Sequence, residues 1–454
     1  MNATMRERFV IHGGSENLSA IGQSCYTFDI RIGDALYRGM CDCGSDIEAE
    51  NDALSEIPEN ANFEKLGPDF SLLDDGKQID FLILTHQHHD HIGFVARLRV
   101  LDRMRVAEGK PPLLAPHFKI WASPQAAAIL AFTLHEGERN EQHILFDTAY
   151  VLNRLQVFPK PGEYEIMPGL WVFVIEAGHI PGALSLAMRL QNREIIYISG
   201  DKCRHDQPVV KGAPTFMSWP QKWWPSQILG TDLTYGISRT TSFQDEVQRL
   251  IERTRAAYAE GKNVFIAALR IGRAQNVALW LSKALWLDRR GGNRIPIWLD
   301  GRIPHFYGIL RNNRWSERDT QLPPLGEESG LFPIEGREHR DQLLAESKPH
   351  VILATGGMMD NGPIRRYMRN RLADKNSCFF ATSWLSPSSD GYALSQLNQQ
   401  RRVNPEKEYY LEMDFEDGSR ERIPVLADFD QFNVGSHDSP DESFHYILDL
   451  AYLR

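Results

Sequence analysis

Alternating apolar and polar positions in the first half of the chain predict β-strands joined by loops. Residues 24–44 alternate like a hairpin whose second strand delivers Asp42 shortly before a glycine. Residues 45–79 carry many acids, prolines and asparagines with little periodicity, and we expect them to form a long surface insertion. The apolar run at residues 79–86 is typical of a buried strand, and it ends at a histidine.

Two later segments repeat this arrangement of an apolar strand followed by a polar residue. Residues 170–179 end at His179, and residues 194–201 end at Asp201. Because three such strands end in side chains that commonly bind metals, the pattern predicts one sheet with a metal site at its edge.

After residue 210 the pattern changes to strands that alternate with amphipathic helices. A stretch rich in tryptophan and proline, residues 217–227, marks the predicted domain boundary. The predicted strands are 227–232, 263–269, 295–301, 350–355 and 377–382, and the predicted helices are 243–260, 274–286 and 362–372. This alternation indicates a parallel sheet covered by helices.

The composition is that of a soluble globular protein. The 454 residues suffice for two or three domains, and 42% of them are hydrophobic and 24% charged. A net charge of −10 argues against general coating of nucleic acid, but it permits a locally basic groove. The chain shows neither a membrane span nor a signal peptide, so no membrane partner is expected. Five scattered cysteines favour the reducing cytoplasm, and Cys41 and Cys43 are expected to be buried core thiols.

The segment "LTHQHHDHIG", residues 84–93, holds four histidines and an aspartate within six positions. Neutral imidazole and carboxylate groups suit zinc and similar divalent ions. His86 and His88 alternate at the end of a strand, so both can point toward one ion. Asp90 and His91 lie where the loop reverses, so they can face a second ion. The two other strand ends described above are expected to supply the remaining ligands.

The histidine segment resembles the signature of the metallo-β-lactamase superfamily, and Asp42, His179 and Asp201 match its other strand-end motifs in order. Five segments of the second half resemble landmarks of the β-CASP insertion: "LGTDLTYG", "ALRIGRAQ", "IWLDG", "ATGGMMDNGP" and "FNVGSHD". The resemblance covers nearly the whole chain. It identifies the chain as a member of the β-CASP proteins, which are nucleases, mostly of RNA, and include ribonuclease J and the endonuclease of pre-mRNA 3′-end processing. A smaller branch acts on DNA.

The resemblance implies an α/β fold, namely a metallo-β-lactamase αββα sandwich with an inserted β-CASP domain built on a parallel sheet. The predicted domains are residues 1–214 for the first part of the lactamase domain, 215–400 for the β-CASP cap, and 401–454 for the return to the lactamase domain. The last part is expected to stop before a final histidine motif of the family.

The resemblance also implies a role for each residue of the metal site. The expected ligands are His86, His88 and His179 on a first zinc ion, Asp201 as the bridge, and Asp90 and His91 on a second zinc ion. Asp90 is also counted among the catalytic residues. Asp42 is expected to orient a ligand histidine rather than to bind metal. His89 occupies a variable position of the motif and is expected to be a non-ligand.

Two zinc ions would neutralise the charge of a phosphodiester and lower the pKa of a bridging water toward about 7, which makes that water the nucleophile. The leaving 3′-oxygen then needs a proton. The resemblance suggests the pair Asp232 and His437 as its source, with the carboxylate holding an imidazolium in place as general acid. From the sequence alone, Asp232 is only a strand-terminal aspartate and His437 a loop histidine.

One position departs from the family pattern. In RNA-cleaving relatives a last histidine, beyond the one that matches His437, completes the second zinc site. Here only His445 lies between His437 and Arg454, on an expected helix. Three explanations are therefore expected: a truncated sequence, a ligand from another chain, or a weak second site. The choice between RNA and DNA stays open.

Two further sets of residues are candidates for binding the substrate. Thr355, Gly356 and Gly357 form a glycine-rich turn at an expected helix start, where backbone amides suit a phosphate; a plain strand–helix turn is the alternative. The basic residues expected on the walls of a cleft between the domains are Arg270, Arg273, Arg365, Arg366 and Arg369, with a solvated helix face as the alternative.

The favoured hypothesis is a zinc-dependent ribonuclease whose partner is single-stranded RNA, with DNA as the alternative substrate and a homo-oligomer or a partner protein left open. A thioester or lactone hydrolase of the superfamily would lack the roughly 200 residues between Asp232 and His437. A non-catalytic scaffold subunit would typically have lost ligands from the histidine segment, which is intact here. The missing last histidine keeps this third alternative open.

Overall fold

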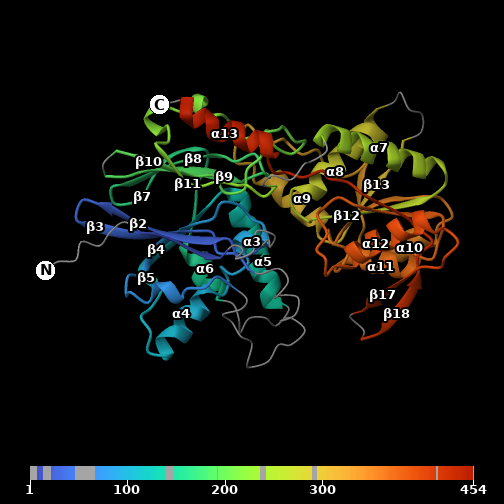
Figure 1. Cartoon of the computed structure of the whole chain (residues 1–454), viewed down its shortest axis with the longest axis horizontal. Coiled ribbons are helices and arrows are strands. Elements are labelled where there is room, and N and C mark those ends of the chain that lie inside the picture. Colours follow the sequence, from blue (N-terminus) through green and yellow to red (C-terminus); the bar gives the residue numbers. More distant parts are fainter. Residues whose placement is uncertain are drawn as a thin grey trace.

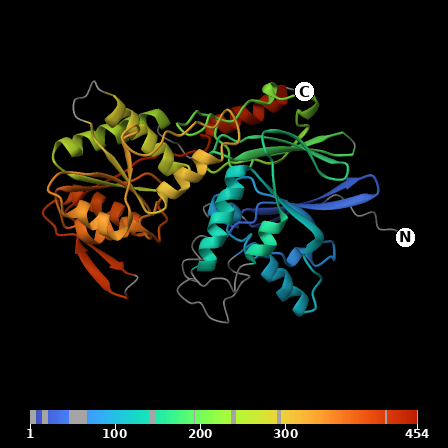
Figure 2. The ribbon, with the colours of Figure 1, turned by 180° about the vertical axis from the view of Figure 1, so that it is seen from behind.

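The computed structural model describes residues 8–13, 22–45, 67–139, 147–191, 193–235, 242–288, 294–415 and 418–452. The chain forms two bodies side by side: a sandwich of two sheets and a cap built on a third sheet (Figure 1, and from behind in Figure 2). The insertion predicted at residues 45–79 lies largely outside the described residues. Within the described ranges, no helix combines the length and the apolar character that crossing a membrane requires.

The first sheet has six strands in the order β1-β2-β3-β4-β5-β6. They are β1 (Phe9–Gly13), β2 (Cys25–Ile32), β3 (Ala35–Cys41), β4 (Ile79–Ile83), β5 (Leu114–Ala122) and β6 (Leu155–Val157). β2 and β3 form the predicted antiparallel hairpin, and β3 to β6 run parallel to one another. Cys41 and Cys43, at the end of this hairpin, are fully buried free thiols, as predicted.

The second sheet has five strands in the order β11-β10-β9-β8-β7. They are β7 (Gly162–Met167), β8 (Leu170–Glu176), β9 (Leu184–Arg189), β10 (Ile195–Ile198) and β11 (Gln227–Gly230). β7 to β10 form an antiparallel meander, and β11 pairs parallel to β10.

The two sheets pack face to face. Phe81 of β4 and Val174 of β8 belong to the same buried cluster between them. Helices α4 (Leu98–Ala107), α5 (Pro124–Arg139) and α6 (Thr148–Arg154) cover the outer face of the first sheet, and α13 (Pro440–Tyr452) covers the second through buried Tyr446. The prediction of one sheet is therefore wrong. β4, which leads to the histidine segment, lies in the first sheet, whereas β8 and β10 lie in the second. An apolar run predicts a buried strand but does not encode which strand it pairs with.

The cap sheet is entirely parallel, in the order β14-β13-β15-β12-β16-β19. Its strands are β12 (Asn263–Ala268), β13 (Ile297–Asp300), β14 (Leu331–Pro333), β15 (Val351–Thr355), β16 (Ser377–Ala381) and β19 (Asp428–Gln431). Its helices are α7 (Phe243–Ala259), α8 (Arg273–Leu281, continued by a π-helical turn, Ser282–Leu287), α9 (Ile303–Asn312), α10 (Gly336–Ala345), α11 (Pro363–Arg371) and α12 (Asp390–Val403). A separate hairpin joins β17 (Tyr410–Asp414) to β18 (Arg420–Pro424).

Helices cover both faces of the cap sheet, which explains why its central strands β12, β15 and β16 are mostly apolar. One face packs on α7, α8 and α9, and the other on α10, α11, α12 and the hairpin. The first of these cores also contains Ile129, Ile180 and Val210 of the sandwich, so the two bodies share apolar packing where they meet.

Strand pairing moves both boundaries from the predicted residues 215 and 400. β11 belongs to the second sheet of the sandwich, and β19 belongs to the cap sheet. We therefore propose that the cap extends from α7 to β19, so that the chain passes from the sandwich to the cap between β11 and α7 and returns after β19.

Candidate metal centre and active site

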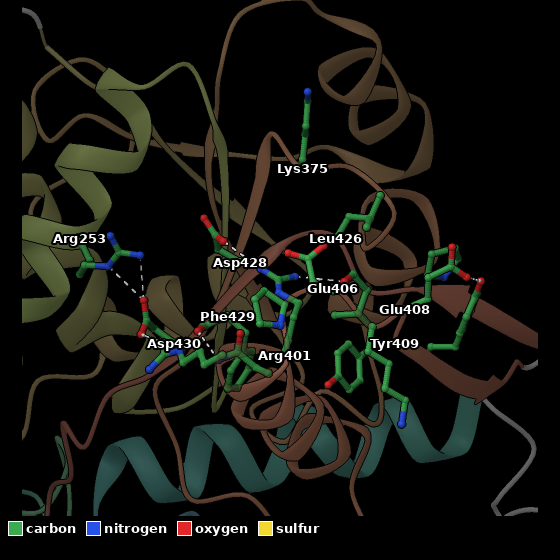
Figure 3. Close-up of a pocket in the computed structure, with 17 residues that line it drawn as sticks. Arg253, Lys375, Arg401, Glu406, Glu408, Tyr409, Leu426, Asp428, Phe429 and Asp430 are labelled. Atoms are coloured by element: carbon green, nitrogen blue, oxygen red, sulfur yellow. Dashed lines mark hydrogen bonds and ion pairs between the residues drawn. The ribbon is translucent and has the colours of Figure 1, made fainter.

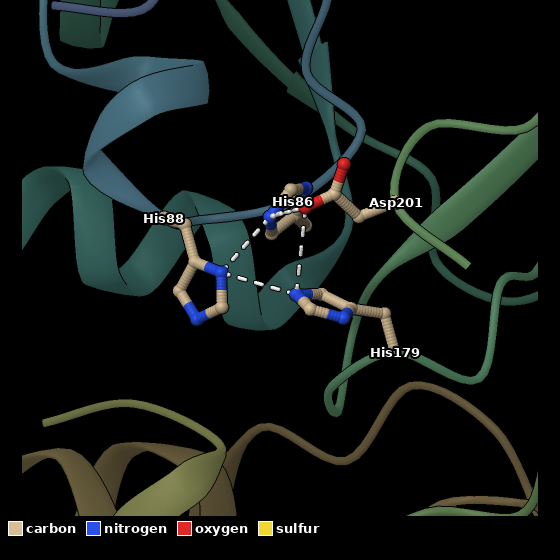
Figure 4. A group of neighbouring side chains, drawn as sticks. All are labelled: His86, His88, His179 and Asp201. Carbon is tan, nitrogen blue, oxygen red and sulfur yellow. Dashed lines mark hydrogen bonds and ion pairs between the residues drawn. The ribbon is translucent and has the colours of Figure 1, made fainter. Parts of the chain in front are cut away.

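Three histidines and an aspartate meet where the two sheets of the sandwich end. His86 and His88 follow β4, His179 follows β8, and Asp201 follows β10. One ligand-type atom from each lies within 4.8 Å of all the others. Figure 4 shows the four side chains pointing toward one another from different segments. His88 Nδ1 is 3.1 Å from both His86 Nε2 and His179 Nε2.

This first cluster fits a divalent cation by the chemistry of its donors. Burial lowers the pKa of His86 and of His179 well below the ordinary value, which favours the neutral imidazole that a metal requires. Neutral imidazole nitrogens converge there with the Asp201 carboxylate, which lies 3.5 Å from His86 Nε2. Three histidines and one carboxylate are a ligand set that zinc accepts.

A second cluster shares Asp201 with the first. Its other members are Asp90 and His91, on the short helix α3 (His89–Ile92). His91 Nε2 lies 3.3 Å from Asp201 Oδ1 and 3.7 Å from Asp90 Oδ2. Burial alone would lower the pKa of His91, but the surrounding carboxylates outweigh burial and raise that pKa well above its usual value. The strong negative field at His91 suits a cation.

His89 and His445 belong to neither cluster among the described residues. The ring of His89 folds back against Gly93, where a Cβ atom would lie 2.6 Å from the ring. His445 is an exposed residue of α13. In the described part of the chain, the second cluster therefore has three members.

Asp42 lies behind the second cluster and contacts His91. Its Oδ2 is 2.7 Å from His91 Nδ1, and its carboxylate also accepts bonds of 2.7 Å from the amide and from the hydroxyl of Thr85. The backbone of Asp42 has φ 57°, a left-handed conformation that aspartate tolerates better than most residues. Asp42 thus reaches one histidine of the segment from behind, on the side away from the cluster.

Asp232 and His437 are 205 residues apart in sequence but lie together, with 2.9 Å between Asp232 Oδ2 and His437 Nδ1. With Asp201 they form a third cluster of ligand-type atoms, so the pair lies directly beside the histidines. Burial would lower the pKa of His437, but the charge and hydrogen bond of Asp232 outweigh burial and raise it. The Asp232 carboxylate accepts from the Lys202 amide at 3.0 Å and from the Thr234 amide at 2.8 Å, and these bonds hold it in place.

Lys202 and Asp438 form a buried ion pair that sequence reasoning missed. Each follows a residue of the site, because Lys202 comes after Asp201 and Asp438 after His437. Their side chains are 0% and 1% exposed, and the Asp438 amide donates to the Lys202 carbonyl at 3.1 Å. A lysine usually lies at the surface, so only its place beside the aspartate motif could have drawn attention to it.

The cap contributes to the same region through the segment that follows β12. His88 Nε2 lies 3.3 Å from the carbonyl oxygen of Ile271. Arg273 is buried, and its guanidinium donates to the carbonyl of Thr382 after β16. Tyr235 packs edge-on against His437, with ring centroids 5.9 Å apart. The carboxyl ends of the cap strands therefore face the first and second clusters, which are called the metal-type clusters below.

The glycine-rich turn after β15 also lies at this edge of the cap. Gly356 has φ +110°, and a Cβ atom on it would lie 2.1 Å from the Asn361 carbonyl. A Cβ atom on Gly357 would lie 2.8 Å from Leu269 and 3.0 Å from the Ser383 hydroxyl. Backbone conformation and packing account for both glycines, and Thr355 ends the strand before them.

The arginines of α11 are engaged within the cap. Arg365 lies 3.0 Å from Asp390, Arg366 lies 2.7 Å from Asp341, and Arg369 pairs with Glu421. Arg270 is exposed and follows β12 at the edge that faces the clusters. Of the arginines predicted for a substrate track, Arg270 and Arg273 lie at that edge.

A cavity of about 710 Å³ lies elsewhere in the cap (Figure 3). It is lined by Arg253 of α7, Arg401 of α12, and Asp428 and Asp430 of β19, among others. Its two aspartates are paired with these arginines, since Asp430 lies 3.0 Å from Arg253 and Asp428 lies 3.2 Å from Arg401. No residue of the three clusters lines it.

Comparison with known proteins agrees with this architecture. The family model of the metallo-beta-lactamase superfamily matches residues 40–201, and that of the Beta-Casp domain matches residues 274–394. The transcription termination factor FttA of Pyrococcus horikoshii is 25% identical over 76% of this chain and 52% of its own length. An RNase J-like protein of Methanocaldococcus jannaschii is 21% identical over 85% of this chain and 79% of its own. Ribonuclease TTHA0252 of Thermus thermophilus is 24% identical over 67% of this chain and 68% of its own.

The chain spans about half the length of the FttA relatives that it matches. Membership of the superfamily implies that the histidine–aspartate clusters bind divalent metal. The sandwich with its clusters at the sheet ends, the parallel-sheet cap and the two family matches lead to one conclusion. The chain belongs to the β-CASP family of the metallo-β-lactamase superfamily.

Proposed function

We propose that this protein is a zinc-dependent phosphodiester hydrolase that cleaves RNA. The observation that carries the proposal is the position of the Asp232–His437 pair, which shares Asp201 with the metal-type clusters. This arrangement sets a proton donor beside a site for cations, and both are needed to cleave a phosphodiester. Two of the relatives bear names of ribonucleases, and a third is named as a transcription termination factor, which supports RNA as the substrate.

The proposal gives each residue of the two clusters a role in binding metal. His86, His88, His179 and Asp201 would hold one zinc ion, and Asp90, His91 and Asp201 the other. Bound zinc would neutralise the phosphate charge and activate a water molecule as nucleophile. Asp42 fixes His91 with its Nδ1 proton toward the carboxylate, which leaves Nε2 free to face the cluster.

His437 is the proposed proton donor to the leaving oxygen. Its Nδ1 is occupied by Asp232, so the proton available for transfer is the one on Nε2. Asp232 stabilises the protonated ring and is itself held by Ser199 and by the Lys202 amide, 3.0 Å from its Oδ2. The acid therefore keeps one orientation without help from the substrate.

The test compares His437→Ala with His445→Ala, a matched change at an exposed histidine of the nearby helix α13. His437→Ala should lower the rate of RNA cleavage by about 10²–10⁴-fold and keep its zinc, because it removes a proton donor and no metal ligand. Asp201→Asn should lose both zinc and cleavage. Elemental analysis and cleavage of labelled single-stranded RNA measure the two effects.

Single-stranded DNA, a thioester and a lactone complete the assay. Faster hydrolysis of DNA, or of either small ester, would replace RNA as the proposed substrate. Cleavage of RNA by His437→Ala at the wild-type rate across a range of pH would remove that histidine from the mechanism.

A further inference from the structure

Two exposed apolar side chains lie at neighbouring strand ends of the cap. Leu269 follows β12 and is 38% exposed, and Trp384 follows β16 and is 49% exposed. β12 and β16 pair in parallel, with Ala267 opposite Ala381, so the segments that follow these two strands leave the sheet at the same edge. Both side chains are therefore presented at the carboxyl edge of the cap sheet.

The turn after β15 brings these two segments into contact. The Cβ position of Gly357 lies 2.8 Å from Leu269 Cδ2 and 3.0 Å from Ser383 Oγ, so the two segments meet over this glycine. Ser383 immediately precedes Trp384. The connections that follow the neighbouring strands β12 and β16 lead to opposite sides of the sheet, to β13 and to β19, and ligands of open α/β sheets bind at such points.

Both side chains are close to the catalytic region along the chain. Leu269 is two residues from Ile271, whose carbonyl oxygen lies 3.3 Å from the metal-type histidine His88. Trp384 is two residues from Thr382, whose carbonyl accepts a hydrogen bond from the buried Arg273. Two residues of extended chain span at most about 7 Å, which is roughly the reach of one nucleotide.

We propose that Trp384, flanked by Leu269, is a stacking site for an unpaired base of the substrate next to the scissile phosphodiester. The inference rests on the proposed function and narrows its substrate to single-stranded nucleic acid with a base at this position. An indole face stacks on any base, and exposed Arg270 beside Leu269 supplies positive charge for the backbone.

A nucleobase fits this surface better than a partner protein does. A stable protein interface buries about 800 Å² on each partner, far more than two half-exposed side chains offer. A single base covers an area close to that of one indole ring. The position at the edge that faces the metal-type clusters also matches a substrate group rather than a separate partner.

The experiment measures RNA binding to the full chain by fluorescence anisotropy. The probes are a short single-stranded RNA and a series of the same RNA in which one base at a time is removed. Trp384→Ala should weaken binding of the complete RNA by roughly 5- to 150-fold, and Trp384→Phe should restore most of it. In the wild type, removal of one particular base should lower the affinity for RNA by the same factor as Trp384→Ala does. In Trp384→Ala, removal of that base should lower the affinity no further.

Trp171→Ala is the matched control, because Trp171 is 39% exposed on β8 of the sandwich. It should bind every probe like the wild type. Equal affinities of Trp384→Ala, Trp171→Ala and the wild type for the complete RNA would overturn the stacking site. Independent losses from Trp384→Ala and from each missing base would overturn it as well. Anisotropy reports binding, and gel analysis of the same RNA reports cleavage, so failure of the proposed nuclease activity would appear separately, as bound RNA that stays intact.

Discussion

Asp42 determines which nitrogen of His91 faces the second cluster. Its carboxylate accepts two bonds from Thr85 and lies 2.7 Å from His91 Nδ1, so that this nitrogen donates and Nε2 is the nitrogen left to face a metal ion. A carboxylate can only accept when ionised, whereas an amide presents an NH₂ group. The chemistry of one atom at position 42 therefore decides whether His91 can bind metal.

Asp42→Asn is expected to lower metal affinity at the second cluster by about 10–100-fold, because the amide would turn the His91 tautomer around. The first cluster should keep its metal. Titration calorimetry of the metal-free protein with zinc separates the two sites. Asp29→Asn is the control, since Asp29 is also buried and pairs with Arg38 on the same sheet. An equal loss of zinc in both variants would show that the effect is one of stability rather than orientation.

The element that holds the acid pair is the segment from His437 into α13. Asp438 is tied to Lys202, the Lys202 ammonium lies 4.6 Å from the centre of the Tyr446 ring, and the Tyr446 hydroxyl bonds to Tyr197 at 2.8 Å. These contacts fasten the returning chain to the second sheet. The segment thus enters the sandwich beside the metal-type histidines instead of following the cap.

Lys202→Met is expected to cost about 3–5 kcal/mol of the free energy of unfolding, because it leaves Asp438 buried without its partner. The double variant Lys202→Met with Asp438→Leu should recover most of that loss, since it buries no unpaired charge. Urea unfolding followed by circular dichroism measures both. A double variant no more stable than Lys202→Met alone would contradict this account of the pair.

The start of α13 should respond to acid through Glu442. Burial would raise the pKa of Glu442, but His205 and the Ser439 amide outweigh burial and lower that pKa to about 2. A lowered folded-state pKa means that the stabilisation is complete above the unfolded value of about 4.3 and is lost as the pH falls toward 2. Glu442→Gln should therefore flatten the decline of the urea midpoint between pH 5 and pH 2, relative to the wild type, by about the share of this group. Asp441→Asn, at the exposed neighbouring acid, should leave the decline unchanged.

At the scale of the whole molecule, residue types and their spacing located most residues of the site. They did not show which strands or which charges pair with one another. His86, His88, His179 and Asp201 could be found from the sequence because they follow apolar strands, and an apolar run that ends in such a residue is a local pattern. The division of these strands between two sheets could not be predicted, because the residues of a strand buried on both faces do not indicate which strand lies beside it. β19 was missed as a cap strand because its four residues include two aspartates, and only pairing with β16 defines it.

The charged residues show the same limit. Arg365 and Arg366 suggested a substrate track, but their acid partners Asp390 and Asp341 are distant in sequence. For the buried Lys202 the only local hint was its place directly after Asp201, and its partner Asp438 is distant in sequence. Non-local pairing, whether of strands or of charges, is the part that a single sequence leaves open.

The charge distribution of the cap predicts where RNA binding depends on salt. Arg270→Glu should make the salt dependence of RNA affinity less steep by about 0.7 for each phosphate that this arginine neutralises, because Arg270 lies at the edge that faces the clusters. Arg366→Glu changes the net charge equally but breaks only its ion pair with Asp341, so the slope should stay the same. Affinities measured across a salt series give both slopes. Equal changes in the two variants would show that the net charge of the molecule, not a local interaction, governs binding.

The 205 residues between Asp232 and His437 also impose an order of events during translation. Every member of the two metal-type clusters has been synthesised by residue 201, whereas the acid pair is complete only after the whole cap has left the ribosome. A growing chain therefore holds every proposed metal ligand long before it holds the proposed proton donor. If the proposed cleavage of RNA depends on His437, the growing chain cannot cleave the message from which it is being made until residue 437 has been added.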